Sequence, residues 1–272
     1  MNKILCSTGA FTGRSNGYNY RLLEPLSKVL TCDGFELMVD DEWYEEIEEV
    51  KRYIKGLNLY IPVVHCAKDI GEMISKGGPE ELAAAYKMFE TDCGVATYLG
   101  AGKLVLHLWG GRTSDSNFQS NIRAYQYLNE VAKSHGLVLM VENIVCNVEN
   151  PMKHLCELRE IYPDIKYVFD TKMAAFHSQM DALYKPENAW LAERIAHFHV
   201  NDYAGGHMDW TNFGAKALGH GHVDFARFCA FVRDISYTGD FTCEGTAVNE
   251  DGSIRYDEMN NSLDWIRKEV SR

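Results

Sequence analysis

The sequence predicts an α/β protein that folds as a closed (β/α)8 TIM barrel, on three observations. Short apolar segments alternate about eight times with segments of helical periodicity along the 272 residues. Most of the apolar segments are continuous rather than alternating, which is typical of parallel strands buried on both faces. The length matches one such barrel, and neither GxGxxG nor a P-loop motif occurs, which counts against an open doubly wound sheet with a nucleotide site.

We therefore expect eight strands, each formed by one apolar segment. In chain order these segments are 3–9, 34–40, 60–67, 103–109, 137–144, 166–172, 195–202 and 240–246. Two intervening segments carry clear helix signals: 79–100 begins with proline and 120–136 with serine, and both end in glycine. Because no linker-like stretch interrupts the chain, residues 1–272 are predicted to form a single domain.

Composition limits the class of function. There are 39 acidic and 27 basic residues, for a formal charge of -12, so nucleic acid is a disfavoured partner and a small molecule is favoured. No secretion signal is evident at the start, and no segment approaches the ~20 apolar residues of a membrane span. We expect a soluble, cytoplasmic protein without a membrane partner, with homo-oligomerisation left open. The eight cysteines form no CxxC pair and are expected to be reduced core thiols.

Potential metal ligands stand at or near the ends of six predicted strands, and the strand ends of a parallel barrel open onto one face. They are His65, His107, Glu142, Asp170, His199 and Glu244. A lone strand histidine is more often a hydrogen-bonded core residue than a ligand. A buried carboxylate without a partner, however, costs roughly several kcal/mol of desolvation, which a shared divalent ion would offset. Salt bridges to Lys103, Lys166 or Lys172 are the structural alternative.

The segment HFHVND, residues 197–202, places two histidines on one face of its strand, because side chains alternate with period two. His199 lies nearer the loop and is the expected ligand. His197 lies deeper, where it would fill a polar layer or support the ligands. Asp202 falls past the strand end and is expected to orient a ligand or to contact substrate.

In order along the chain, VVHCA, LVLHLWGG, LMVENI, YVFDTKMA, HFHVND, LGHGHVDF and FTCEG resemble the xylose isomerase-like TIM barrel superfamily over nearly the full length. That superfamily includes sugar isomerases and epimerases, inosose dehydratase-type enzymes and the endonuclease IV family. The resemblance implies one divalent ion held by Glu142, Asp170, His199 and Glu244. In endonuclease IV-like members, the counterparts of His65 and His107 join that of Glu142 around a second ion.

Such a site predicts a divalent-metal-dependent sugar or polyol isomerase or epimerase that acts by proton transfer through an enediolate. The ion would be Mn²⁺, Zn²⁺, Co²⁺ or Mg²⁺, with no nucleotide cofactor. It would polarise a substrate carbonyl, while Glu142 and Glu244 act as the catalytic acid–base pair. A metal-dependent lyase or dehydratase of a keto-sugar or inosose is the alternative, and a non-catalytic sugar- or metal-binding barrel is the second.

Three further residues are expected to contact the carbohydrate or polyol substrate. Trp109 could form a wall of the pocket, with ordinary core packing as the alternative, and Lys172 and Asp202 could bind substrate oxygens. Departures from the resemblance also matter. Met173 stands where the family often has a histidine, and together with the acidic charge this disfavours an endonuclease IV-type DNA repair enzyme.

Overall fold

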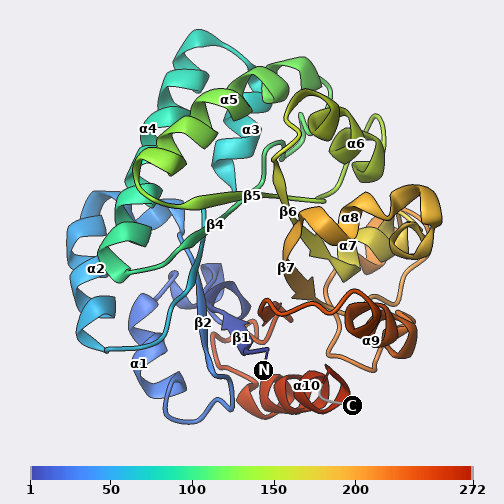
Figure 1. Cartoon of the computed structure of the whole chain (residues 1–272). Helices are drawn as coiled ribbons and strands as arrows, with labels where there is room; N and C mark the ends of the chain where they lie inside the picture. The colour runs from blue at the N-terminus through green and yellow to red at the C-terminus, as the bar shows by residue number, and fades with distance from the viewer. Residues whose placement is uncertain (1, 271–272) are drawn as a thin grey trace. The chain divides into compact units, whose positions relative to one another are not determined.

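The computed structural model describes residues 2–270, in which eight parallel strands follow one another in chain order around a closed barrel (Figure 1). The strands are β1 (Ile4–Ser7), β2 (Gly34–Met38), β3 (Val63–His65), β4 (Lys103–Leu106), β5 (Val138–Glu142), β6 (Lys166–Asp170), β7 (Ile195–Val200) and β8 (Phe241–Cys243). This confirms the predicted (β/α)8 TIM barrel. Each strand lies inside its predicted segment but is shorter, because the last residues of most segments already belong to the following loop or helix.

Each strand is followed by one or more helical segments. The α-helices are α1 (Leu23–Leu26), α2 (Ile47–Gly56), α3 (Asp69–Lys76), α4 (Pro79–Leu99), α5 (Phe118–Ser134), α6 (Pro151–Ile161), α7 (Thr171–Phe176), α8 (Trp190–Arg194), α9 (Phe225–Asp234) and α10 (Tyr256–Val270). Short 3-10 helices are η1 (Thr8–Ala10), η2 (Arg14–Asn16), η3 (Tyr20–Leu22), η4 (Asp41–Glu46), η5 (Met180–Tyr184), η6 (Pro186–Asn188) and η7 (Trp210–Asn212). The helix predicted at 79–100 is confirmed as α4, which Gly100 ends in a left-handed conformation with φ of 88°.

Contacts group the chain into two compact units, which we call the first and second unit. The first comprises residues 1–36, 56–60 and 169–272, and the second comprises 37–55 and 61–168. In the first unit, α10 packs against β1 and α9, as Figure 1 shows in red and dark orange beside the blue N-terminal strand. In the second unit, α3, α4 and α5 pack against one another.

Strand β7 explains how one short segment carries both core and polar residues. Phe198 turns outward from the barrel and packs against Phe228 of α9 and Phe241 of β8, with ring centroids 5.2 and 5.6 Å apart. Because side chains alternate along a strand, His197 and His199 turn to the opposite face, where both are fully buried. The two histidines of HFHVND therefore line the barrel interior.

Two findings concern the rest of the chain. All eight cysteines are free thiols, and six of them are buried, which confirms the prediction of reduced core cysteines. Between residues 2 and 270, no helix combines the length and apolar character that crossing a membrane requires.

Candidate metal and active site

The six predicted metal donors stand where the sequence placed them, at strand ends. His65, Glu142 and Asp170 are the last residues of β3, β5 and β6. His199 is the last but one residue of β7, whereas His107 and Glu244 follow β4 and β8 directly. Glu142, Asp170 and His199 are at most 1% exposed, so these strand ends bury ionisable groups.

Three of the donors meet within the first unit. Ligand atoms of Asp170, His199 and Glu244 lie within 4.8 Å of one another, and His199 Nδ1 is 3.3 Å from Glu244 Oε2. Asp170 is also the N-cap of α7, where its Oδ1 accepts the backbone N–H of Met173 at 2.7 Å. This bond fixes the carboxylate at the point where strand gives way to helix. Oxygen and imidazole donors gathered in this way fit a divalent ion such as Mn²⁺, Zn²⁺, Co²⁺ or Mg²⁺.

Asn201 links two of these donors, and the sequence did not single it out. Its side-chain N–H groups lie 2.6 Å from Asp170 Oδ2 and 3.4 Å from Glu244 Oε2, while its Oδ1 accepts the backbone N–H of Glu244 at 3.1 Å. The backbone of Asn201 is held in turn by the Thr171 hydroxyl, at 2.6 and 2.9 Å. Asn201 therefore orients both carboxylates. The available signal was its position two residues after His199, at the end of a strand that carries a ligand.

A buried polar cluster lies behind His199 in the barrel interior. Glu36 of β2, His197 and Thr242 of β8 are all fully buried and bonded to one another. Burial alone would raise the pKa of Glu36, but the adjacent imidazoles of His199 and His197 outweigh burial and hold its pKa well below the usual range. Through Glu36, this cluster connects His197 and Thr242 to the ring of His199.

The other three predicted donors meet within the second unit. Glu142 Oε2 lies 2.8 Å from His107 Nε2 and 3.4 Å from His65 Nε2. His65 Nδ1–H donates to the carbonyl of Cys66 at 2.7 Å, so Nε2 is the ring nitrogen that faces the carboxylate. Burial lowers the pKa of His107 to about 4, although Glu142 opposes the shift. Ligand atoms of these three residues lie within 4.8 Å of one another, so the group could hold a second cation.

The loop after β3, which follows His65, is fastened by a buried carboxyl. Asp92 of α4 accepts the hydroxyl of Tyr44 and the backbone N–H of Ala67, both at 2.9 Å. Because it is fully buried, desolvation raises the pKa of Asp92 to about 7 despite these bonds. Asp92 therefore helps to hold the chain just after His65, a predicted donor.

Trp109 and Asp202, two predicted substrate contacts, are both buried and bonded to other parts of the protein. Trp109 is fully buried, donates its indole N–H to the carbonyl of Val145 at 3.0 Å and packs edge-on against Phe118. These contacts fit the core-packing alternative, and a role of Trp109 as a pocket wall stays a prediction. Asp202 is 1% exposed and accepts four backbone N–H groups, its own neighbour's and three from the loop before α9. These donors are Tyr203, Gly219, Gly221 and Val223, at 2.8 to 3.1 Å.

The four bonds occupy the acceptor positions of the Asp202 carboxylate and hold the loop before α9, whereas its contact with substrate stays a prediction. Lys172 lies in the first turn of α7, where its ammonium group sits 3.9 Å above the ring of Phe213. Its side chain is partly exposed.

A further group of metal-ligand types, Asp115, Cys146 and His154, has a structural role in the second unit. Asp115 accepts the backbone N–H groups of Asn147, Val148 and Glu149, as well as His154 Nε2–H at 2.9 Å. A carboxylate surrounded by donors has little capacity left for a cation. The group instead fixes the loop between β5 and α6.

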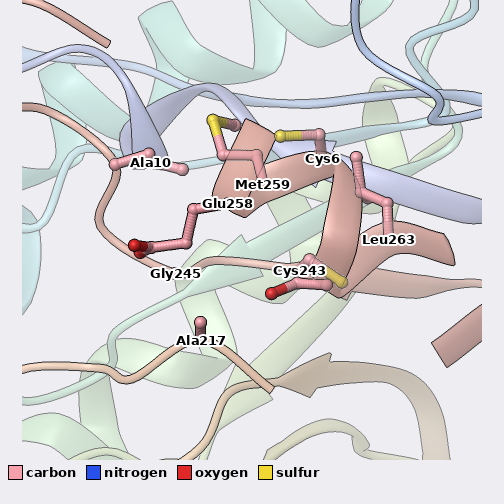
Figure 2. A pocket seen from close by; sticks show the side chains of 10 residues that line it. Cys6, Ala10, Ala217, Cys243, Gly245, Glu258, Met259 and Leu263 are labelled. Atoms are coloured by element: carbon pink, nitrogen blue, oxygen red, sulfur yellow. The ribbon is translucent and has the colours of Figure 1, made fainter. Parts of the chain in front are cut away.

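A small open pocket, with about 300 Å³ of empty volume, lies in the first unit beside the start of α10 (Figure 2). Its lining is mostly apolar and includes Cys243 and Gly245, the sequence neighbours of Glu244, but none of the predicted donors. The lining residues are Cys6, Ala10, Ala217, Cys243, Gly245, Ala247, Glu258, Met259, Ser262 and Leu263. The pocket therefore borders the β8 strand end without being the metal site.

Comparisons with known proteins give a family model and solved structures of similar fold. The family model described as "Xylose isomerase-like TIM barrel" matches residues 27–269. A D-tagatose 3-epimerase-like protein is 16% identical over 99% of this chain and 97% of that one, with a TM-score of 0.75. D-allulose 3-epimerase from Methylomonas sp., solved with D-allulose, is 17% identical over 98% and 97%, with a TM-score of 0.73.

An L-ribulose 3-epimerase structure is 16% identical over 100% of this chain and 95% of that one, with a TM-score of 0.73. No curated protein matches the chain. At these identities the likeness to solved structures establishes the fold.

Proposed function

Because the chain belongs to the xylose isomerase-like TIM barrel family, we propose that it is a divalent-metal-dependent isomerase or epimerase of a sugar or polyol. Two of the similar structures named above are 3-epimerases, of D-allulose and of L-ribulose, and the third is described as D-tagatose 3-epimerase-like, which favours a ketose as substrate. The observation that carries the proposal is the meeting of Asp170, His199 and Glu244 within 4.8 Å at the ends of three strands.

Glu142 is the proposed fourth ligand. It ends β5 as Asp170 ends β6, and the carboxyl ends of the strands in a parallel barrel open onto the same face. Two glutamates, one aspartate and one histidine leave coordination positions open for substrate oxygens. His65 and His107, which contact Glu142, are the proposed ligands of a second ion or contacts of the substrate.

When bound, the divalent ion supplies Lewis-acid stabilisation of the negative charge that develops on the substrate oxygens. Glu142 and Glu244 are the proposed acid–base pair: one carboxylate removes the proton from the carbon next to the carbonyl, and the other returns a proton to the opposite face. The bond from His107 holds Glu142 in place for this transfer, and the Asn201 amide does the same for Glu244. Lys172 is the proposed contact to a substrate oxygen.

The proposal is tested by purifying the protein, measuring its bound metal and following exchange of solvent deuterium into a panel of ketoses, aldoses and inososes. We expect metal-dependent exchange into at least one sugar, with an isomer as the product. Glu142→Gln and Glu244→Gln should each lower the exchange rate by about 100-fold or more, because general acid–base catalysis contributes about that much.

The matched control is Glu160→Gln, which removes an exposed carboxylate on α6 and should leave exchange unchanged. Full exchange in both glutamine variants of the site would overturn the acid–base assignment. A product that is one water molecule lighter than its substrate would indicate the lyase or dehydratase instead. Tight sugar or metal binding without exchange would indicate a binding protein.

A further inference from the structure

We propose that Glu36 is a positioning residue for the metal site, because it keeps the proton of the His199 ring on Nε2 and so presents Nδ1 to the ion. This inference rests on the proposed function, in which His199 is a ligand. Glu36 lies on β2, in a part of the sequence that is not among the predicted metal ligands, and its side chain is fully buried.

The hydrogen-bond directions follow from the groups present. His199 Nε2 lies 3.0 Å from Glu36 Oε1 and 3.2 Å from Oε2. An ionised carboxylate can only accept, so Nε2 must carry the proton and donate it. The other ring nitrogen, Nδ1, lies 3.3 Å from Glu244 Oε2. The contact with Glu36 therefore leaves Nδ1 as the ring nitrogen that faces the other proposed ligands.

The second side of the Glu36 carboxylate is also occupied by donors. Thr242 donates its hydroxyl to Glu36 Oε2 at 2.8 Å, so the single hydroxyl proton is already used. His197 Nε2, which lies 2.7 Å from the same hydroxyl oxygen, must then be a donor too. The chain of donation runs from His197 through Thr242 to Glu36, and every proton in it points toward the carboxylate.

The negative charge of Glu36 distinguishes a positioning role from a role in packing alone. A buried carboxylate costs several kcal/mol of desolvation, roughly, unless positive charge lies close by. A divalent ion on Nδ1 would face that charge through the imidazole ring, and a carboxylate on the far nitrogen makes a ligating histidine a stronger donor to the metal. An amide of the same size would fill the same space without either effect.

The first measurement uses the wild-type protein without metal. In ¹⁵N-labelled histidine spectra at pH 7.5, we expect His199 to give the pattern of a ring protonated on Nε2, assigned by its loss in His199→Gln. A wild-type His199 that carries its neutral-state proton on Nδ1 would overturn the proposal. The ring pattern itself is read from the wild-type protein, and the variant is used only to assign the signal.

The second measurement compares Glu36→Gln with Thr242→Val by titration of Mn²⁺ and of Zn²⁺ into the metal-free proteins. The glutamine amide can donate to Nε2, which moves the ring proton to Nδ1, so affinity should fall by about 10- to 100-fold. Thr242→Val breaks the same buried cluster but leaves both contacts between Glu36 and His199. It should keep the wild-type affinity and ring pattern.

Three outcomes are separable. If wild type binds neither ion, the proposed function fails, while the ring pattern still tests Glu36 alone. If Glu36→Gln keeps the wild-type affinity and ring pattern, Glu36 is not a positioning residue. If Thr242→Val weakens binding as much as Glu36→Gln does, disturbance of the cluster explains both losses and the proposal is wrong.

Discussion

Asn201 is the side chain that bonds two carboxylates of the candidate site, those of Asp170 and Glu244. Its amide donates to Asp170 and to Glu244, two carboxylates that would otherwise face each other without a hydrogen bond between them. Asn201→Asp keeps the size but replaces the donor by a third negative charge. We expect the metal-free variant to lose about 1–3 kcal/mol of unfolding free energy or more, because charged groups lose a partner.

The measurement is urea denaturation of both proteins with and without Mn²⁺. A cation among the carboxylates offsets their repulsion, so the stability difference between wild type and Asn201→Asp should narrow when Mn²⁺ is present. A difference that is absent in the metal-free proteins would contradict the role given to the amide.

Asp92 predicts a pH dependence whose sign follows from burial. Its pKa is raised from 3.8 to about 7, so the folded protein holds this proton more tightly than the unfolded chain does. Between pH 4 and pH 7 the unfolded chain ionises first, and folding stability falls by up to about 4 kcal/mol on this account, with no further change above pH 7.

Asp92→Asn removes the titration. Relative to wild type, its unfolding free energy should rise as the pH increases from 4 to 7 and then stay level, which denaturant titrations at a series of pH values would show. Asp257→Asn, at an exposed position, is the control and should give a flat difference. If the difference in unfolding free energy between Asp92→Asn and wild type did not change with pH either, Asp92 would not be the source of the pH dependence.

At the scale of residues, the sequence predicted the strand-end positions of the proposed donors but not the hydrogen bonds that hold them. His65, Glu142 and Asp170 could be found because each is a metal-ligand type that ends an apolar strand. Glu36 and Asn201 could not be assigned, because their roles depend on which atoms of other strands face them. The partners of Trp109 and Asp202 could not be predicted either, because Val145 and Gly221, which bond to them, lie far along the chain.

At the scale of elements, α3 lies so close to the chain after β4 that one of its positions must be glycine. A Cβ atom on Gly71 would come 2.3 Å from the His107 carbonyl oxygen and 2.5 Å from that of Trp109. Both atoms belong to the backbone, so neither can move aside cheaply. Because His107 is a proposed site residue, this packing helps to fix the strand end that carries it.

Gly71→Ala should therefore destabilise the protein by about 1–3 kcal/mol, the usual cost of overpacking, even though alanine is the better helix former. Gly94→Ala in α4 is the matched control, because a Cβ there meets nothing within 4 Å. That variant should gain about 0.5–1 kcal/mol. Thermal or urea unfolding of the two variants measures both signs, and two substitutions of equal effect would refute the close packing.

The elements themselves were largely predictable. All eight strands were found from continuous apolar segments, since a strand covered on both faces leaves that trace in sequence. Strand ends were overestimated, as at β3, because the buried apolar residues Cys66 and Ala67 continue past the strand end. The acidic segment before α2 forms the 3-10 helix η4 with Trp43 buried, which composition alone did not indicate.

At the scale of the whole molecule, the proposed ion should stabilise the fold, because an ion that binds only the folded state shifts the unfolding equilibrium. Free Mn²⁺ at 100 times its Kd would add about 2.7 kcal/mol. For a chain of this length, that raises the melting temperature by several degrees, roughly 5–10 °C.

Scanning calorimetry in Mn²⁺ and in a chelator measures the shift, and Asp170→Asn should abolish most of it. Equal melting temperatures under the two conditions in wild type would count against a resident divalent ion.

The contact between Asp202 and the loop before α9 also bears on how freely this barrel can be altered. The carboxylate grips main-chain N–H groups, which every amino acid except proline supplies, so the fastening does not depend on the side chain of the exposed His220. Gly221 is the exception, because a Cβ there would lie 2.3 Å from Asp202 Oδ1. A combinatorial library that randomises position 220 and spares 221 would then change the chemistry of the loop while its path over the barrel stays the same.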